Sequence, residues 1–201
     1  INAGSIVLPA PRVTNNEIEV DITQPIYNST FIFYPDGTID EKITRKSYPI
    51  SSELPFVTPY PIEELPMYDL PIGKTVLLVC ADSWYPESYE RIRQLEPSVV
   101  LVNSYCAGDN TMNNLWRGYD GGNTPSDVDT TDIGKIKEGE AWNKYAMPSR
   151  LYKTQTSYGV NVFLRGELWD LGTDGQPFIY HRGELQEIKS SAKAGIWNFC
   201  F

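Results

Sequence analysis

Two short apolar runs with an amphipathic segment between them constrain the fold of this chain most. Thr75–Val79 and Ser98–Val102 are apolar at nearly every position, which is typical of strands buried on both faces of a parallel sheet. The segment between them, Pro86–Leu95, begins with Pro-Glu as a first helical turn prefers, and Tyr89 and Ile92 fall on one face of the expected helix. Because parallel neighbours need a crossover connection, the sequence predicts a βαβ unit over these residues.

Other apolar or β-branched segments lie on both sides of this unit. The turn signal Pro35–Gly37 ends one of them. We expect further strands at Ser5–Leu8, Tyr27–Tyr34, Tyr158–Leu164 and Pro177–Tyr180. Strands of both buried and exposed type around a βαβ unit predict the α/β class with a mixed sheet.

The remaining segments predict one more helix and a long loop. Glu140–Thr156 has the character of a helix that Pro148 kinks or restarts. Asn110–Gly139 is rich in Gly, Asn, Asp and Thr without an apolar period, and a loop of this length in a compact domain is usually functional. The length of 201 residues suits a single domain over residues 1–201.

Charge and histidine content exclude several kinds of function. The chain has 17 Lys and Arg residues against 26 Asp and Glu, a formal net charge of −9, so we expect no binding to nucleic acid or to an anionic membrane. The single histidine, His181, cannot supply a zinc site of the HExxH type or a convincing Ser-His-Asp triad. No motif indicates an organic cofactor, so we expect neither a cofactor nor a metal.

The cysteines indicate a reducing environment. Cys80, Cys106 and Cys200 include no CxxC pair, which argues against a disulfide framework and a structural zinc site and predicts free thiols in the cytoplasm. The longest strongly apolar run, residues 75–80, is far shorter than the roughly 18 residues of a membrane span. The chain begins at Ile1 instead of Met, so we expect the natural N-terminus, with any targeting signal, to precede it.

Cys80 comes directly after the first apolar run, where α/β proteins usually place their chemistry. A cysteine there is either a buried structural residue or a nucleophile. In the second case, a nearby cation and the backbone N–H groups of the turn stabilise its thiolate. The residues around Cys80 favour the nucleophile.

Two separate motifs resemble those of one enzyme family. Val79–Glu87 follows the pattern of an apolar strand, then Cys-x-Asp-x-x-aromatic-Pro-Glu, which resembles the nucleophile segment of the nitrilase, or carbon–nitrogen hydrolase, superfamily. Upstream, Arg45–Glu53 resembles the RKxxPxxxE segment of the same family. Tyr27–Ser29 and Pro35–Gly37 resemble the strand and turn before that segment, and the likeness covers most of residues 27–184.

This resemblance implies a fold and a set of catalytic residues. The fold would be the mixed-sheet αββα-sandwich of the carbon–nitrogen hydrolases. Cys80 would be the nucleophile, Lys46 the cation that stabilises the thiolate and later an oxyanion, and Glu53 a supporting carboxylate. The Ala81 backbone N–H is next to the nucleophile and suits the same oxyanion.

Four further residues are expected to shape the site. Asp82 and Glu87 match motif positions, and we interpret them as structural holders of the turn and the helix start. Asn103 and Tyr105 follow the second buried strand, whose end faces the substrate in the family; they either line the substrate pocket or pack at its rim.

One expected catalytic residue has no counterpart. The family's general base is a Glu directly after Pro, well before the lysine, and no Pro-Glu precedes Lys46 in this chain. The nearest segment has Ala10 at that place, and Glu17 and Glu19, in an expected polar loop, are poor substitutes. We therefore expect the domain to be incomplete at its N-terminus and to need a complementary N-terminal segment or a partner chain.

The resemblance implies hydrolysis of a non-peptide carbon–nitrogen bond through a cysteine thioester. An amide is favoured over a nitrile as the small-molecule substrate, because the CxDxxxPE form resembles amidase-type members. Two alternatives remain open: an inactive binding or scaffold relative that lacks the base, and an N-acyltransferase that passes the thioester acyl group to an amine. Family members commonly pair, so the resemblance also implies a homo-oligomer.

Overall fold

A six-stranded mixed sheet is the centre of the computed structural model, which describes residues 4–108, 110–121, 123–165, 172–188 and 195–196. Its strands lie in the order β11-β10-β9-β8-β7-β6. They are β6 (Met67–Leu70), β7 (Gly73–Val79), β8 (Val99–Ser104), β9 (Tyr158–Phe163), β10 (Phe178–His181) and β11 (Glu184–Glu187). β7, β8 and β9 are parallel and the other neighbours antiparallel, which confirms the expected α/β class with a mixed sheet.

The predicted βαβ unit is present. Helix α1 (Pro86–Leu95) has the predicted bounds, with Pro86 in its first turn, and it ends at Glu96, whose left-handed φ of 50° closes the helix. β7 and β8 pair in parallel with Leu77 opposite Leu101. The apolar character of both strands therefore reflects burial on both faces of the sheet.

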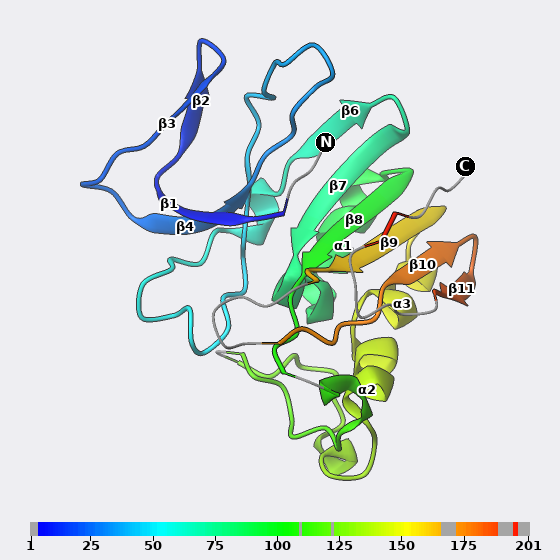
Figure 1. Ribbon diagram of the computed structural model, residues 1–201. Helices are drawn as coiled ribbons and strands as arrows, with labels where there is room; N and C mark the ends of the chain where they lie inside the picture. The colour runs from blue at the N-terminus through cyan, green and yellow to red at the C-terminus, as the bar shows by residue number, and fades with distance from the viewer. Residues whose placement is uncertain (1–3, 109, 122, 166–171, 189–194, 197–201) are drawn as a thin grey trace.

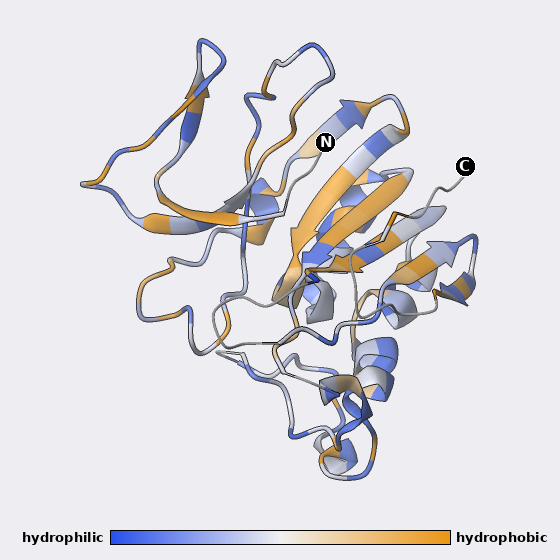
Figure 2. Cartoon of the chain, in the orientation of Figure 1, coloured by the Kyte–Doolittle hydropathy of each residue, from blue (hydrophilic) through white to orange (hydrophobic). Residues whose placement is uncertain are grey.

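The two faces of the sheet carry different layers. Val76, Leu78 and Val100 pack with α1 and the other helices in the larger core cluster, whereas Leu77 packs with Ile32 and Tyr68 on the opposite face. Figure 2 shows this concentration of apolar residues along β7 and β8. The order of layers is thus helices, the large sheet and a second β layer.

The second β layer is a small antiparallel sheet beside β7 (Figure 1). It consists of β1 (Ile6–Pro9), β4 (Ile26–Thr30) and β5 (Thr44–Arg45), in the order β1-β4-β5. A separate hairpin contains β2 (Arg12–Thr14) and β3 (Glu17–Glu19). The small sheet positions the site, because Asn28 lies in β4 and Lys46 directly follows β5.

The expected second helix is divided in two. α2 (Glu138–Tyr145) ends before α3 (Met147–Arg150), so the break falls beside Pro148, which cannot continue a hydrogen-bonded helix. Short 3₁₀ turns complete the helical structure: η1 (Ile62–Glu64), η2 (Cys80–Trp84), η3 (Thr111–Asn113), η4 (Thr130–Asp132) and η5 (Leu151–Lys153). No helix in the described part of the chain is long and apolar enough to cross a bilayer.

Several local predictions need correction. The strand expected over Tyr27–Tyr34 ends at Thr30, although the turn at Pro35–Gly37 forms as predicted, with the Gly37 N–H donating to Tyr34 O at 3.0 Å. Glu17 and Glu19 lie in strand β3 and not in a loop. The sequence does not predict β2, β3, β5, β6 or β11, because strands of two to four residues with polar positions carry little apolar signal.

The segment expected as a long loop is structured in part. It contains η3 and η4, and it buries Met112 and Trp116 against the main core. A bidentate ion pair attaches this segment to α3: the Arg150 guanidinium donates to both carboxylate oxygens of Asp127, at 2.7 and 2.8 Å. This segment closes one side of the cavity described next.

Candidate active site

Cys80 is the first residue after β7 and is held in an unusual backbone conformation. Its φ of 49° lies in the left-handed region, which a non-glycine residue adopts only under constraint. The constraint comes from the tight turn η2, in which the Ser83 hydroxyl donates to Cys80 O at 2.7 Å. The turn places the thiol at the end of the sheet, as strand-to-helix turns do for the nucleophilic serine of α/β-hydrolases.

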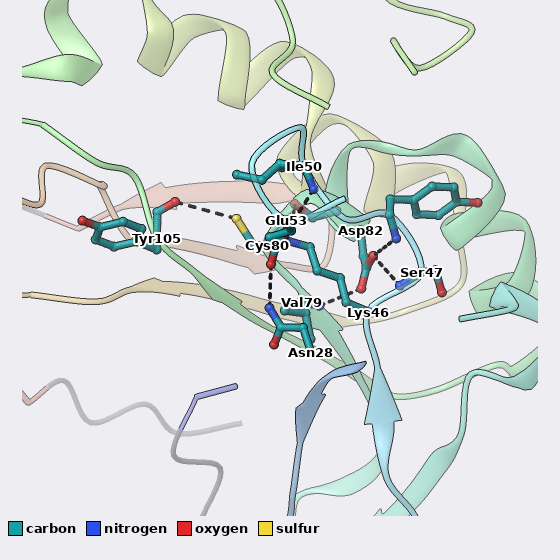
Figure 3. A network of polar contacts seen from close by, with 11 residues as sticks. Asn28, Lys46, Ser47, Ile50, Glu53, Val79, Cys80, Asp82 and Tyr105 are labelled. Carbon is teal, nitrogen blue, oxygen red and sulfur yellow. Dashed lines mark hydrogen bonds and ion pairs between the residues drawn. The ribbon is translucent and has the colours of Figure 1, made fainter. Parts of the chain in front are cut away.

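Lys46 supplies a buried cation beside this thiol. Its side chain is only 3% exposed, and its ammonium donates a short hydrogen bond to Glu53 Oε2. Figure 3 shows the lysine extending between Asp82 and Glu53, next to Cys80. Burial opposes its charge, but the negative charges of Cys80 and Glu53 hold the pKa of Lys46 above its ordinary value.

Glu53 is fixed from three directions. Besides Lys46, the Asn28 side-chain amide donates to its Oε1 at 2.8 Å and the Ile50 N–H to its Oε2 at 2.9 Å. These donors come from β4, from the residue after β5 and from the turn that holds Glu53 itself. The carboxylate therefore has a single orientation, in which it orients the ammonium of Lys46.

Asp82 joins the lysine segment to the cysteine turn. Its carboxylate accepts the backbone N–H groups of Ser47 at 3.0 Å, Tyr48 at 2.9 Å and Val79 at 3.1 Å. Complete burial raises the pKa of Asp82 to about 6, although Lys46 and these donors oppose the shift. The geometry fits the structural role expected for Asp82.

A cavity of about 1400 Å³ opens in front of Cys80. It contains all six residues that the sequence assigned to the site: Cys80, Lys46, Glu53, Ala81, Asn103 and Tyr105. Asn103 Nδ2 lies 3.3 Å from Thr30 Oγ1, which ties it to the small sheet. Tyr105 reaches the nucleophile with its main chain, since its carbonyl oxygen accepts from Cys80 Sγ at 3.7 Å (Figure 3).

Four aromatic residues and one carboxylate form another side of the cavity, which we call the aromatic wall. Its members are Trp84, Trp116, Tyr119, Trp142 and Glu138. Trp84 is central, with ring centroids 5.0 Å from Trp142, 5.5 Å from Tyr119 and 6.2 Å from Trp116. Burial raises the pKa of Glu138 to about 7, opposed by the Trp142 indole N–H and reinforced by Asp120.

Cys106 lines the same cavity but has a different environment. Burial, together with the charges of Glu138 and Cys80, raises the pKa of its thiol to about 12. A thiol of that pKa stays protonated at neutral pH and is a poor nucleophile. Cys200 lies outside the described residues.

Sequence reasoning missed the aromatic wall and Asn28. The residues 116, 119 and 138 fall in or beside the segment without an apolar period, so no pattern marked them. Asn28 lay within the quoted strand motif, but nothing in the sequence indicated that its amide would meet Glu53. Among the described residues, no group of three or more His, Cys, Asp or Glu side chains could hold a metal ion.

Comparisons with known proteins identify the fold. No protein-family model and no curated protein matches the chain. Among solved structures, it is similar to Nit3 of Saccharomyces cerevisiae, a member of branch 10 of the nitrilase superfamily. That match has 18% identity and a TM-score of 0.58 over 90% of this chain and 52% of Nit3. A carbon–nitrogen hydrolase from Helicobacter pylori G27 gives 15% identity and a TM-score of 0.59, over 90% and 56% of the two chains.

An amidase with a known ligand is also similar. The amidase from Nesterenkonia sp. AN1, in a mutant complexed with butyramide, gives 15% identity and a TM-score of 0.56 over 89% of this chain and 54% of its own. Another mutant of that enzyme carries the acetamide moiety of fluoroacetamide on its active-site cysteine. This chain thus spans about half the length of these structures, and the part it spans has the fold of the nitrilase superfamily of carbon–nitrogen hydrolases.

Proposed function

We propose that this chain carries the cysteine nucleophile of a carbon–nitrogen hydrolase that cleaves small amides. The observation that supports this most is the buried Lys46–Glu53 pair in the same cavity as Cys80. A buried ion pair costs desolvation free energy and is weak evidence for stability. Its position beside a thiol in a strained turn therefore favours a chemical role.

The proposed reaction begins with attack of the Cys80 thiolate on the amide carbon. The carbon–sulfur bond forms as the carbonyl electron pair moves to oxygen, and the Lys46 ammonium and the Ala81 N–H stabilise that oxyanion. Collapse of the intermediate breaks the carbon–nitrogen bond, and the leaving amine takes a proton from a general acid. Water then attacks the thioester and gives a proton to the same group, which is now the base; the carbon–sulfur bond breaks and releases the carboxylic acid and the Cys80 thiolate.

The general acid and base is proposed to be a carboxylate outside residues 1–201. This follows from the resemblance, because the general base of the nitrilase superfamily is a Glu directly after Pro that precedes the lysine segment, and this chain has no such Pro-Glu before Lys46. Pairing with a second chain and a cytoplasmic location are also kept as proposals. An amide is preferred over a nitrile as substrate, in keeping with the butyramide complex of the structurally similar amidase.

Alkylation with fluoroacetamide tests the proposal. Carbon–fluorine bonds react slowly with ordinary thiols, so we expect the full-length protein to gain one acetamide group on Cys80 and none on Cys106, as read by intact mass and peptide mapping. Cys106→Ser is the matched control and should be labelled like the wild type. Cys80→Ser should remain unlabelled and should release no ammonia from butyramide.

Two outcomes would contradict the proposal. One is labelling of Cys106 in preference to Cys80. The other is release of ammonia from butyramide that continues after Cys80 has been fully alkylated. A Cys80 that is labelled while the full-length protein hydrolyses no amide would instead favour the scaffold or acyl-transfer alternatives.

A further inference from the structure

The aromatic wall holds a carboxylate, Glu138, whose charge is favoured only by the Trp142 indole N–H and has no ion-pair partner within the described part of the protein. Glu138 is the first residue of α2 and lines the cavity. No ion pair among the described residues involves it. Its charge is further disfavoured by the negative charge of Asp120. A cation supplied by a ligand would relieve both penalties.

The surroundings of Glu138 are suited to an organic cation. Trp84, Trp116 and Trp142 are each no more than 5% exposed, so this part of the cavity excludes water from the indole rings. An ion pair is stronger at such a low-dielectric wall than in water.

The other charged groups of the cavity do not neutralise Glu138. The Lys46 ammonium is hydrogen-bonded to Glu53. Arg117 lines the cavity with an exposed side chain, as does Asp120. Counted over these five residues, three carboxylates face two cations, and the excess charge is negative.

We propose that Glu138 binds a positively charged group of the substrate. This inference rests on the proposed function, and it implies that the preferred substrates are amides carrying an ammonium or guanidinium group. Charge-assisted hydrogen bonds from such a group to the carboxylate would fix the substrate at one end. The amide would then lie at the other end of the cavity, at Cys80. A neutral amide of the same length would lack this anchor.

A pair of isosteric ligands tests the inference: 5-aminopentanamide, which carries an ammonium group at pH 8, and hexanamide, which ends in a methyl group. Binding is measured by titration calorimetry on the full-length Cys80→Ser protein, which has no nucleophile. We expect the cationic amide to bind at least about 10-fold more tightly, as a hydrogen bond to a charged group implies. Glu138→Gln should remove that preference and leave the affinity for hexanamide unchanged.

Glu140→Gln is the matched control. Glu140 lies on the same helix, is exposed and does not line the cavity, so this variant should keep the preference. Equal affinity for the two ligands in the Cys80→Ser protein would overturn the inference, and so would a Glu138→Gln variant that weakens both equally. The proposed function is tested separately, by fluoroacetamide labelling at Cys80. If that labelling is absent, the proposed function fails, and the comparison of the two ligands still tests whether Glu138 binds a cation.

Discussion

The two sides of the cavity differ in where their charges find partners. On the side of Lys46, each charged group is matched inside the protein: the ammonium by Glu53, and Asp82 by three backbone N–H groups. On the aromatic wall, Glu138 has no ion-pair partner among the described residues, and the Trp142 indole N–H is the group that favours its charge. The first arrangement is complete without a ligand, whereas the second is the one that our inference assigns to a cationic group of the substrate. Substitutions on the first side should therefore damage folding and chemistry together, and substitutions on the second should separate them.

Replacing Lys46 should have the largest effect. Lys46→Met removes the cation beside Cys80 and leaves Glu53 buried without a counter-ion. We expect fluoroacetamide labelling at pH 7 to slow about 10²-fold, the size of loss that removing one electrostatic stabiliser of the reaction typically causes. The free energy of unfolding should fall by about 3–5 kcal/mol, measured by urea denaturation.

Lys74→Met is the control for this substitution. Lys74 is an exposed lysine near the start of β7, at the other end of the strand from Cys80, and its loss should change neither quantity. If the Lys46→Met protein is labelled at the wild-type rate, Lys46 does not assist the reaction of Cys80, and the two sides of the cavity do not differ in their effect on the chemistry.

Replacing Glu53 should have an intermediate effect. Both oxygens of Glu53 accept hydrogen bonds, so the amide group of Glu53→Gln must direct its NH₂ at a donor. We expect a loss of about 1–3 kcal/mol in the free energy of unfolding and slower amide hydrolysis. Glu63→Gln, at an exposed position in η1, should match the wild type in both measurements. An unaffected Glu53→Gln protein would show that the carboxylate does not orient Lys46.

Replacing Glu138 should have the smallest effect on the fold, and of opposite sign. Because the pKa of Glu138 is raised in the folded protein from 4.5 to about 7, its ionisation lowers the free energy of unfolding as the pH rises through that range. Glu138→Gln lacks this penalty. The variant should therefore be more stable than the wild type by about 1–2 kcal/mol at pH 8, allowing for the partial exposure of the carboxylate.

The pH dependence distinguishes this effect from a general gain in stability. The difference between Glu138→Gln and the wild type should shrink toward zero by pH 4 in urea denaturation. The groups near Glu138 are Asp120, Cys106 and the Trp142 indole. Asp120→Asn is the control for the charge of Asp120: it removes the repulsion that helps to raise the pKa of Glu138, so the difference in stability between Glu138→Gln and its parent should become smaller in that background. A Glu138→Gln protein that is less stable at pH 8 would mean that the protein itself satisfies the carboxylate.

The sequence allowed more to be predicted about the side of Lys46 than about the aromatic wall, for a physical reason. Cys80 follows a run of buried apolar residues, and Lys46 and Glu53 lie in one short motif, so local pattern and resemblance together marked all three. The unbroken apolar runs of β7 and β8 likewise reflect burial on both faces. These are features that neighbouring residues determine.

The aromatic wall depends on contacts between distant segments. Trp84 comes from the cysteine turn, Trp116 and Tyr119 from the segment after η3, and Trp142 from α2. Whether these side chains come into contact depends on how the segment after η3 packs against the sheet, and the Arg150–Asp127 ion pair helps to fix that packing. A contact between distant residues leaves no periodic pattern in the sequence, so the sequence predicts this segment only as a loop.

The bonds that Asp82 makes have a consequence for how the thiol behaves during folding. They link the turn of Cys80 to Tyr48 and Ser47, which lie 34 and 35 residues before Asp82. Contacts of such separation form late because a long loop must close first. A nascent or partly unfolded chain therefore has a sulfur without its neighbouring cation, no more reactive than that of free cysteine. The thiol and the ammonium therefore come together only in the finished fold, through the bonds that Asp82 makes to both segments.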